Sequence, residues 1–341
     1  MKKIIIYTSI ILLSIFLFSC EKLVMDEPIS ENPKETFEYL WTEIDQHYSF
    51  FEYKNVDWDS IHSAYKPLVN DQLNDYQLFN LLFDMLSELK DGHVNLISHF
   101  NISRYEFDLK GKNNYNERLI RENYISEKYY RTGPFTHDYV QDKNIGYIRY
   151  SSFSNDVSEY SMDFVLARFS NTDGLILDLR QNGGGSVSNI FNILNHFVKQ
   201  RTALYKSYIK TGPEHNAFSN AQIAYAEPKG QYSYTQQPLM VLVDRGSFSA
   251  TSFFSLACKT IPNIYLVGDT TGGGLGAPSG GQLPNGWTYR FSVTQTLSLD
   301  NKNYENGVPP DFFAELDDTD VLLGKDAIID KAVEEILKLK K

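Results

Sequence analysis

A serine hydroxyl follows an apolar run and a tight turn within residues 239–259. The run breaks after Asp244, and Ser249 stands where a second apolar stretch, of helical character, begins. Such a strand-turn-helix arrangement exposes the Ser249 hydroxyl at the start of a helix, with the backbone amide of Ala250 free to bind a developing oxyanion. Ser247 or Ser249 could equally be an ordinary helix N-cap, which is a common role of serine. The segment alone leaves a nucleophile and a cap both open.

Two glycine-rich turns follow other apolar runs. In GLILDLRQNGGGS (174–186) a strand pattern leads into three glycines and then a helix, which suits an oxyanion hole, a phosphate cradle or simply a sharp turn. A phosphate loop is disfavoured because no Gly-Lys-Ser/Thr ending follows. In VGDTTGGGLGAPSGG (267–281), Pro278 and Gly280 prevent a following helix, which excludes a dinucleotide loop. We expect this second turn to be a flexible or substrate-lining loop.

A nucleophilic serine needs a base, and the chain has seven histidines. Only His93 lies directly beyond a glycine that caps a predicted helix, at the junction between two predicted domains. None of the seven has metal-ligand spacing and Cys258 is alone on a predicted helix, so we expect no metal site. Glu305, in YENGVPPD (304–311), is a carboxylate beside a turn, a setting that is ordinarily solvated surface.

The apolar patterning divides the chain into parts that would position these residues. Apolar stripes with helical spacing predict a three-helix domain at residues 35–92, and residues 101–140 are weakly patterned and are expected to be irregular or edge structure. From residue 145 short apolar strands alternate with helices, so residues 93–341 are expected to form an α/β domain. The predicted strands are 145–150, 174–179, 239–244, 264–269 and a long one at 289–299, and a charged amphipathic helix is predicted at 327–339.

The N-terminus has the features of a targeting segment. Two lysines precede an apolar run that is short for a membrane span, and the run ends in Ser19-Cys20. This pattern resembles a bacterial lipoprotein signal, so residues 1–19 are predicted to be removed, Cys20 to be lipidated and residues 20–34 to form a tether. The alternative is an uncleaved anchor helix with an incidental cysteine. The expected location is extracytoplasmic, lipid-anchored to a bacterial membrane in the periplasm or on the cell surface.

Charge and length narrow the classes of partner. The 341 residues carry a formal net charge of −11, and an acidic surface repels nucleic-acid phosphates, so we expect no nucleic-acid partner. The sequence does not determine the oligomeric state.

Five motifs, taken in order, resemble the tail-specific, C-terminal processing serine peptidase family: KDGHV (90–94), ILDLRQNGGG (176–185), RGSFSATSFF (245–254), VGDTTGGG (267–274) and ENGVPPD (305–311). The resemblance spans roughly residues 35 to 320. It implies a crotonase-like α/β core, as in the Clp protease, preceded by a small N-terminal helical domain. It implies Ser249 as the nucleophile, with the backbone amides of Gly184 and Ala250 as the oxyanion hole.

The chain departs from one branch of that family and is similar to another. The processing-peptidase branch uses a lysine whose position falls near Gly274, but no lysine stands between Lys259 and Lys302, and the family's middle PDZ domain is also missing. The tricorn-core-like branch uses a histidine and a glutamate, which match His93 and Glu305 here. That branch has a serine directly before its histidine, where this chain has glycine.

The resemblance implies a serine endopeptidase that needs no cofactor and hydrolyses peptides or unfolded protein tails through a serine nucleophile and a histidine base. The missing lysine and PDZ domain keep an alternative open: a catalytically silent protein that binds peptides or apolar ligands on the same scaffold. A crotonase-type acyl-thioester enzyme shares the fold, but the predicted export signal disfavours it because coenzyme A substrates are cytoplasmic.

Overall fold

The apolar repeat near the N-terminus folds into helices in the computed structural model, which describes residues 32–105 and 111–340. Side chains fix where two of the helices begin. Asn32 accepts a hydrogen bond from the backbone N–H of Glu35, and Asn74 forms a reciprocal capping box with Gln77. The elements are α2 (Pro33–His47), the single turn α3 (Phe51–Lys54), α4 (Trp58–Tyr65), the 3-10 turn η1 (Lys66–Leu68) and α5 (Asp75–Ser87). The three long helices agree with the sequence prediction.

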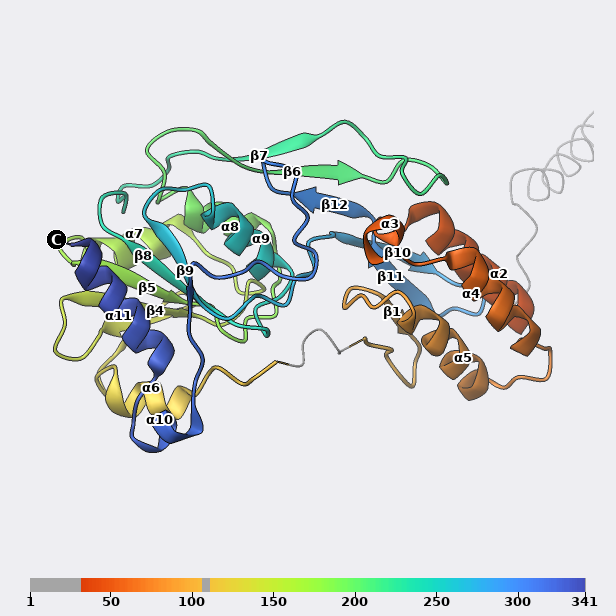
Figure 1. Ribbon diagram of the computed structural model, residues 1–341, viewed down its shortest axis with the longest axis horizontal. Helices are drawn as coiled ribbons and strands as arrows, with labels where there is room; N and C mark the ends of the chain where they lie inside the picture. The colour runs from red at the N-terminus through yellow and green to blue at the C-terminus, as the bar shows by residue number, and fades with distance from the viewer. Residues whose placement is uncertain (1–31, 106–110, 341) are drawn as a thin grey trace, which may run out of the picture.

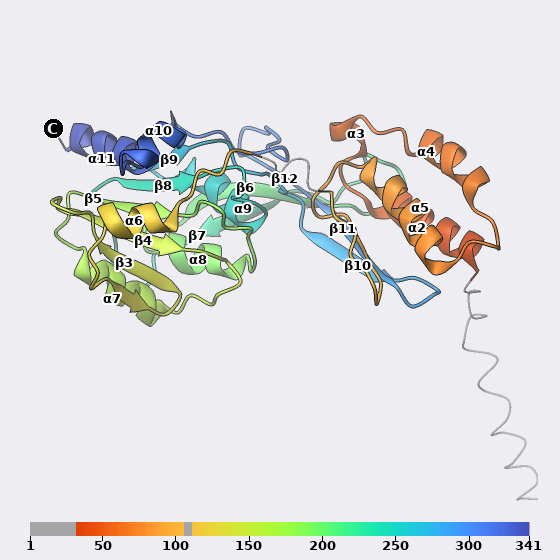
Figure 2. The ribbon, with the colours of Figure 1, turned by 90° about the horizontal axis from the view of Figure 1, so that it is seen from below.

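These helices share their core with a small sheet that comes largely from a distant part of the chain. The sheet is antiparallel in the order β1-β11-β10, and Figure 2 shows it beside α2 and α5. Its strands are β1 (Asn95–Ile97), β10 (Pro278–Gln282) and β11 (Thr288–Ser292). Trp287 and Phe291 pack in one core with Phe37 and Phe79. The body expected from residues 35–92 therefore includes a hairpin that its apolar stripes need as a partner.

A seven-stranded sheet forms the second body (Figure 1). Its order is β13-β9-β8-β5-β4-β3-β2, parallel from β13 to β4 and antiparallel beyond β4. The strands are β2 (Tyr130–Thr132), β3 (Phe135–Tyr139), β4 (Ile145–Tyr150), β5 (Gly174–Asp178), β8 (Leu239–Val243), β9 (Ile264–Gly268) and β13 (Phe312–Phe313). The predicted α/β character is confirmed. Within residues 101–140, which were expected to be irregular or edge structure, β2 and β3 form one edge of the sheet.

Helices cover both faces of this sheet. Successive residues of β5 point to opposite faces, so Leu175 and Leu177 join one core and Ile176 joins the other. The first face is covered by α7 (Glu159–Arg168), α8 (Ser188–Leu194) and α9 (Ala250–Cys258). The second face is covered by α6 (Glu117–Asn123) and α11 (Ala327–Leu339), with α10 (Asp318–Leu322) nearby. The helix predicted at 327–339 is confirmed.

A third sheet, in the order β12-β6-β7, extends beside the two bodies (Figure 1). It consists of β6 (Thr202–Ile209), β7 (Gln222–Ala226) and β12 (Thr294–Leu297). The single strand predicted at 289–299 is therefore wrong, because β11 and β12 belong to different sheets. Val293 lies at the break, where its N–H donates to the carbonyl of Ala277 and its carbonyl accepts from the N–H of Lys210.

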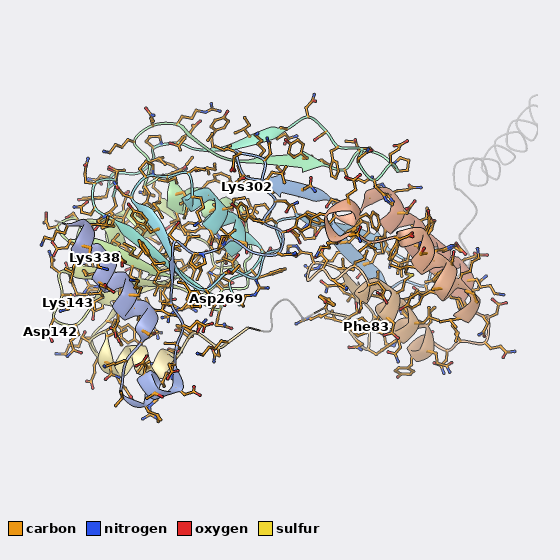
Figure 3. All side chains as sticks on the ribbon, viewed as in Figure 1. Phe83, Asp142, Lys143, Asp269, Lys302 and Lys338 are labelled. Carbon is orange, nitrogen blue, oxygen red and sulfur yellow. The ribbon has the colours of Figure 1, made fainter. Side chains whose placement is uncertain are left out.

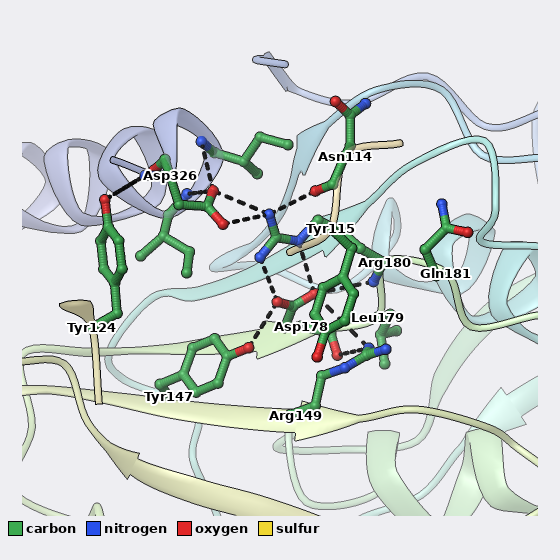
Figure 4. A network of polar contacts seen from close by, with 12 residues as sticks. Asn114, Tyr115, Tyr124, Tyr147, Arg149, Asp178, Leu179, Arg180, Gln181 and Asp326 are labelled. Atoms are coloured by element: carbon green, nitrogen blue, oxygen red, sulfur yellow. Dashed lines mark hydrogen bonds and ion pairs between the residues drawn. The ribbon is translucent and has the colours of Figure 1, made fainter. Parts of the chain in front are cut away.

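A buried ion network fixes the end of β5 (Figure 4). The Arg180 guanidinium is fully buried and lies 2.6 Å from an Asp178 carboxylate oxygen and 2.9 Å from one of Asp326. It also donates to the backbone carbonyl of Asn114, and the Tyr147 hydroxyl donates to Asp178. Asp326 is the N-cap of α11, so the network joins the end of β5 to α11 and to the segment around Asn114. It lies just before the point where the chain enters the glycine turn at 183–185. The Arg180 guanidinium is therefore bound by other groups of the protein.

The predicted signal segment, residues 1–19, the lipidation site Cys20 and most of the tether at 20–34 lie outside the described residues. Within the described part of the chain, the helices are too short or too polar to cross a membrane.

Candidate active site

Three loops meet at one edge of the main sheet. They follow β5, β8 and β9, and the carboxyl ends of neighbouring parallel strands meet at the same edge. The N–H of Phe248 donates to the carbonyl of Asn182 at 3.0 Å, and the N–H of Ser249 donates to the carbonyl of Gly273 at 2.9 Å. Three of the motifs identified in the sequence are therefore adjacent in space.

Ser249 occupies the N-cap position of α9 without acting as a cap. Its backbone has φ 55° and ψ −121°, which is strained for a residue with a Cβ, and its side chain makes no capping hydrogen bond. The Ser249 hydroxyl instead lies 2.9 Å from Nε2 of His93. Ser247, the other candidate cap, is buried and donates to the carbonyl of Leu179. Of the two readings left open by the sequence, the geometry favours the nucleophile.

His93 reaches Ser249 from the helical body, where it follows α5. It is 4 % exposed, and its backbone N–H donates to Oδ1 of Asp91 at 2.8 Å. Oδ2 of Asp91 accepts from the hydroxyls of Tyr48 and Ser292, so the carboxylate that holds the His93 backbone is itself held on two sides. The pair Ser249–His93 thus exists only because the two bodies pack together.

Burial lowers the pKa of His93 below its usual value of 6.5, because the charged imidazolium loses solvation. The negative charge of Asp91 opposes this shift, while the positive charges of Arg290 and Lys54 add to it. A weaker interaction with the Gly276 backbone raises the pKa, although Nδ1 of His93 has no partner in hydrogen-bond geometry among the described residues. The imidazole is therefore neutral at pH 7, the state that can accept a proton from serine.

The two amides expected to form the oxyanion hole lie side by side. A Cβ added to Gly184 would lie 2.8 Å from the Ala250 nitrogen, so the two backbones are in close contact. Ala250 is the first residue of α9, where a backbone N–H has no acceptor within the helix. The Gly184 N–H, in contrast, donates to Oδ1 of Asn182 at 3.0 Å. A bound oxyanion would have to share this amide with Asn182 or displace its side chain.

Glu305 lies beneath the loop that follows β9. It is 4 % exposed; its Oε2 accepts from the N–H of Leu275 at 2.6 Å and its carbonyl accepts from the N–H of Gly274 at 3.0 Å. A Cβ on Gly274 would lie 3.1 Å from Cε1 of His93, so the loop held by Glu305 touches the imidazole. Glu305 is therefore near the site, but Nδ1 of His93 does not donate a hydrogen bond to its carboxylate.

Lysines do not occupy the position that a Ser-Lys dyad would need. At Gly274, φ is +75° and a Cβ would lie 2.5 Å from the Phe248 ring, so the loop leaves no room for a long side chain. Lys259 is paired with Asp311 at 2.7 Å, and Lys302, labelled in Figure 3, is paired with Asp300 at 2.8 Å. Among the described residues, groups of three His, Cys, Asp or Glu side chains suited to a metal ion are also absent.

Sequence reasoning missed two residues that shape this site. Asp91 fixes the backbone of His93, and the Phe248 ring stacks at a tilt against the imidazole with ring centroids 4.8 Å apart. Asp91 could have been suspected from its place two residues before the histidine, since an Asp side chain commonly accepts from a backbone N–H two positions on. The contact of Phe248 has no comparable local signal.

The chain is similar to known peptidases. A model of peptidase family S41 matches residues 144–313, and a model of the tricorn protease C1 domain matches residues 30–87. The carboxy-terminal processing proteases CtpA and CtpB of Bacillus subtilis (strain 168) are each 27% identical, over 181 and 190 residues, or 52% and 50% of this chain. The chain covers only 37% of the length of each of these two relatives.

Solved structures extend the similarity to nearly the whole chain. A protein of Parabacteroides merdae ATCC 43184, proposed to be a peptidase, is 37% identical with a TM-score of 0.85, over 90% of this chain and 97% of that one. Mature CPAF, with a TM-score of 0.67 and 13% identity over 91% of this chain and 96% of that one, shares the fold alone. The chain has the mixed α/β fold of S41 structures with a small helical region before it, and it belongs to peptidase family S41.

Proposed function

We propose that this protein is a serine endopeptidase that cleaves peptides or unfolded protein tails, with Ser249 as nucleophile and His93 as base. The observation that carries the proposal is the 2.9 Å contact between Nε2 of His93 and the hydroxyl of Ser249, made by a serine with a strained backbone at a helix start. Strain of this kind persists where the surrounding structure imposes it, and active-site nucleophiles are a common case.

The geometry supports an acyl-transfer mechanism. Neutral His93 takes the hydroxyl proton at Nε2 as the Ser249 oxygen attacks the substrate carbonyl, and the imidazolium then gives that proton to the departing amine. The oxyanion would accept a hydrogen bond from the backbone N–H of Ala250. It would accept a second one from the N–H of Gly184 once the Asn182 side chain has moved away from that N–H. Each such donor contributes on the order of 3 kcal/mol to lowering the barrier. Water then releases the acyl group by the same steps.

Glu305 has a supporting role in this proposal. It would stabilise the imidazolium of His93, directly or through a water, while its hydrogen bond to Leu275 keeps the Gly274 loop against the ring. The proposed setting is extracytoplasmic, with a lipid on Cys20 tethering the catalytic body to a bacterial membrane. A similar solved structure at 15% identity, which shares the fold alone, is described as a lipoprotein from Streptococcus agalactiae.

Cleavage of an unfolded protein tests the proposal. The parent should fragment reduced, denatured casein, whereas Ser249→Ala and His93→Ala should lower the rate at least about 100-fold, because each removes a partner in proton transfer. Ser170→Ala, whose exposed hydroxyl donates only to a nearby carbonyl, is the matched control and should retain full rate. Full activity in either site variant would refute the assignment.

A second candidate function rests on the occupied Gly184 amide. If the Asn182 side chain still accepts the hydrogen bond from the Gly184 N–H when a ligand is bound, the oxyanion hole stays incomplete. The protein would then bind peptides or apolar ligands without hydrolysing them. Tight peptide binding by the parent with no cleavage over days would favour this function.

A further inference from the structure

A pocket of about 410 Å³ lies next to the residue that precedes His93. Gly92 lines it, and consecutive Cα atoms are about 3.8 Å apart, so the pocket begins one residue from the base. The Phe248 ring also lies against Gly92, since a Cβ there would be 2.9 Å from the ring edge. A peptide held at Ser249 could therefore place a side chain or its terminus in this pocket.

Two arginines line this pocket without an acidic partner. Arg104 and Arg290 contribute to its wall, and neither guanidinium has a carboxylate within 4.0 Å among the described residues. The two charges are close enough for Arg104 to lower the pKa of Arg290, an effect second only to partial burial. Two other arginines, Arg168 and Arg180, do pair with carboxylates, at 2.8 Å and 2.6 Å. In a chain with net charge −11, these two guanidinium groups of the pocket would attract an anionic group.

The Arg290 side chain is also held in place. Its Nε donates to Oδ1 of Asn95 at 2.6 Å, and Nδ2 of Asn95 donates to the carbonyl of Ser103. Hydrogen bonds from the described residues do not engage the two terminal nitrogens of Arg290, and a guanidinium fork fits both oxygens of a carboxylate. Asp91 attracts Arg290 as well, but its two oxygens are already taken by His93, Tyr48 and Ser292.

We propose that Arg104 and Arg290 form a carboxylate-binding subsite that selects peptides with a negative charge near the scissile bond. The inference rests on the proposed peptidase function for the idea that a peptide lies along the site. The carboxylate would be either an Asp or Glu side chain or the free C-terminus of the peptide. The apolar side chains of Ile97 and Ile102 in the same wall suit the aliphatic part of such a residue.

Binding to a variant without turnover tests the subsite even if the protein is not a peptidase. In a Ser249→Ala background, fluorescent peptides would be compared by anisotropy in matched pairs: C-terminal acid against amide, and internal Glu against Gln at each position. We expect one pair to show about 10-fold to 100-fold tighter binding of the charged member, the range expected for a charged hydrogen bond. The pair that responds identifies the source of the carboxylate.

Arg104→Gln and Arg290→Gln in that background should each reduce the preference, and the double variant should abolish it, with unchanged circular dichroism. Arg118→Gln is the control, because Arg118 is exposed and pairs only with Glu122 one helical turn away. Equal binding of charged and neutral peptides by the Ser249→Ala protein, or a preference that survives the double substitution, would overturn the subsite. Neither result would bear on hydrolysis, which is measured separately in the parent.

Discussion

The protonation of His93 sets the lower pH limit of the proposed activity. The base works only when neutral, and burial lowers its pKa below 6.5, so activity should be constant at neutral pH and fall as the pH drops through a midpoint below 6.5. The measurement is kcat/KM against pH with a neutral peptide substrate. A midpoint at or above 6.5 would contradict the burial of a neutral imidazole.

Charges beside His93 should move that midpoint in opposite directions. Arg290 lowers the pKa of His93, so Arg290→Gln should raise the midpoint; Asp91 raises it, so Asp91→Asn should lower the midpoint. Arg104→Gln supplies the comparison, since it removes a pocket charge that is not among the main causes of the lowered pKa of His93. Parallel pH profiles of the three variants check the signs, and a shift in the same direction for Arg290→Gln and Asp91→Asn would refute the proposed electrostatics.

Asp91→Asn should also weaken the fold. Oδ2 of Asp91 accepts from the buried Tyr48 hydroxyl and from Ser292, and an amide nitrogen in its place cannot accept either bond. A buried donor left without an acceptor costs about 1–3 kcal/mol, so we expect the free energy of unfolding to fall by about 2 kcal/mol. Tyr48→Phe, which removes one of the two donors, should partly restore stability in the double variant. Urea denaturation followed by fluorescence measures both, and an unchanged midpoint for Asp91→Asn would contradict this role.

At the scale of elements, the glycine turn after β5 offers a matched pair of substitutions. Gly184 has φ +94°, and a Cβ would lie 2.7 Å from the Phe248 carbonyl oxygen and 2.8 Å from the Ala250 nitrogen, whereas a Cβ on Gly183 would meet nothing within 4 Å. Gly184→Ala should therefore displace the start of α9, cost more than about 1 kcal/mol of stability and abolish peptide cleavage. Gly183→Ala should change the unfolding free energy by less than about 0.5 kcal/mol. Similar effects of the two substitutions on cleavage would show that the turn does not shape the site.

The same scale shows which elements the sequence could predict. Strands β4, β5, β8 and β9 and helix α11 were predictable, because continuous apolar runs and a strong helical stripe leave few alternatives. Residues 101–140 were predicted only as irregular or edge structure, and β2 and β3 do lie at a sheet edge, where polar residues weaken the strand pattern. The break between β11 and β12 was missed because Val293 continues the apolar alternation, and only its bonds to Ala277 and Lys210 reveal the change of sheet.

The site itself was only partly predictable. Ser249 and His93 are 156 residues apart, so the motifs could name them but not the contact between them. The choice between nucleophile and cap depended on the backbone of Ser249, and its strained angles arise from hydrogen bonds to other loops. The occupied amide of Gly184 is likewise a tertiary property, since Asn182 is also held by the carbonyl of Tyr150.

At the scale of the whole molecule, the Arg180 network joins the sheet to α11. Arg180→Met would leave the carboxylates of Asp178 and Asp326 buried without their cation, and breaking a buried pair in this way costs about 3–5 kcal/mol. We expect that loss in the free energy of unfolding from urea denaturation. Arg118→Gln, which breaks an exposed pair, should cost less than about 1 kcal/mol. A similarly small effect of Arg180→Met would mean that the network contributes little to stability.

The two bodies of the molecule each supply half of the proposed catalytic pair, with His93 from the helical body and Ser249 from the main sheet. The most direct test is the intact mass of the protein after incubation with diisopropyl fluorophosphate at neutral pH. We predict one adduct, located on Ser249 by peptide mapping, absent from Ser249→Ala and at least about 100-fold slower to form in His93→Ala. No adduct on the parent, or an adduct that forms equally fast without His93, would contradict a serine activated by that histidine.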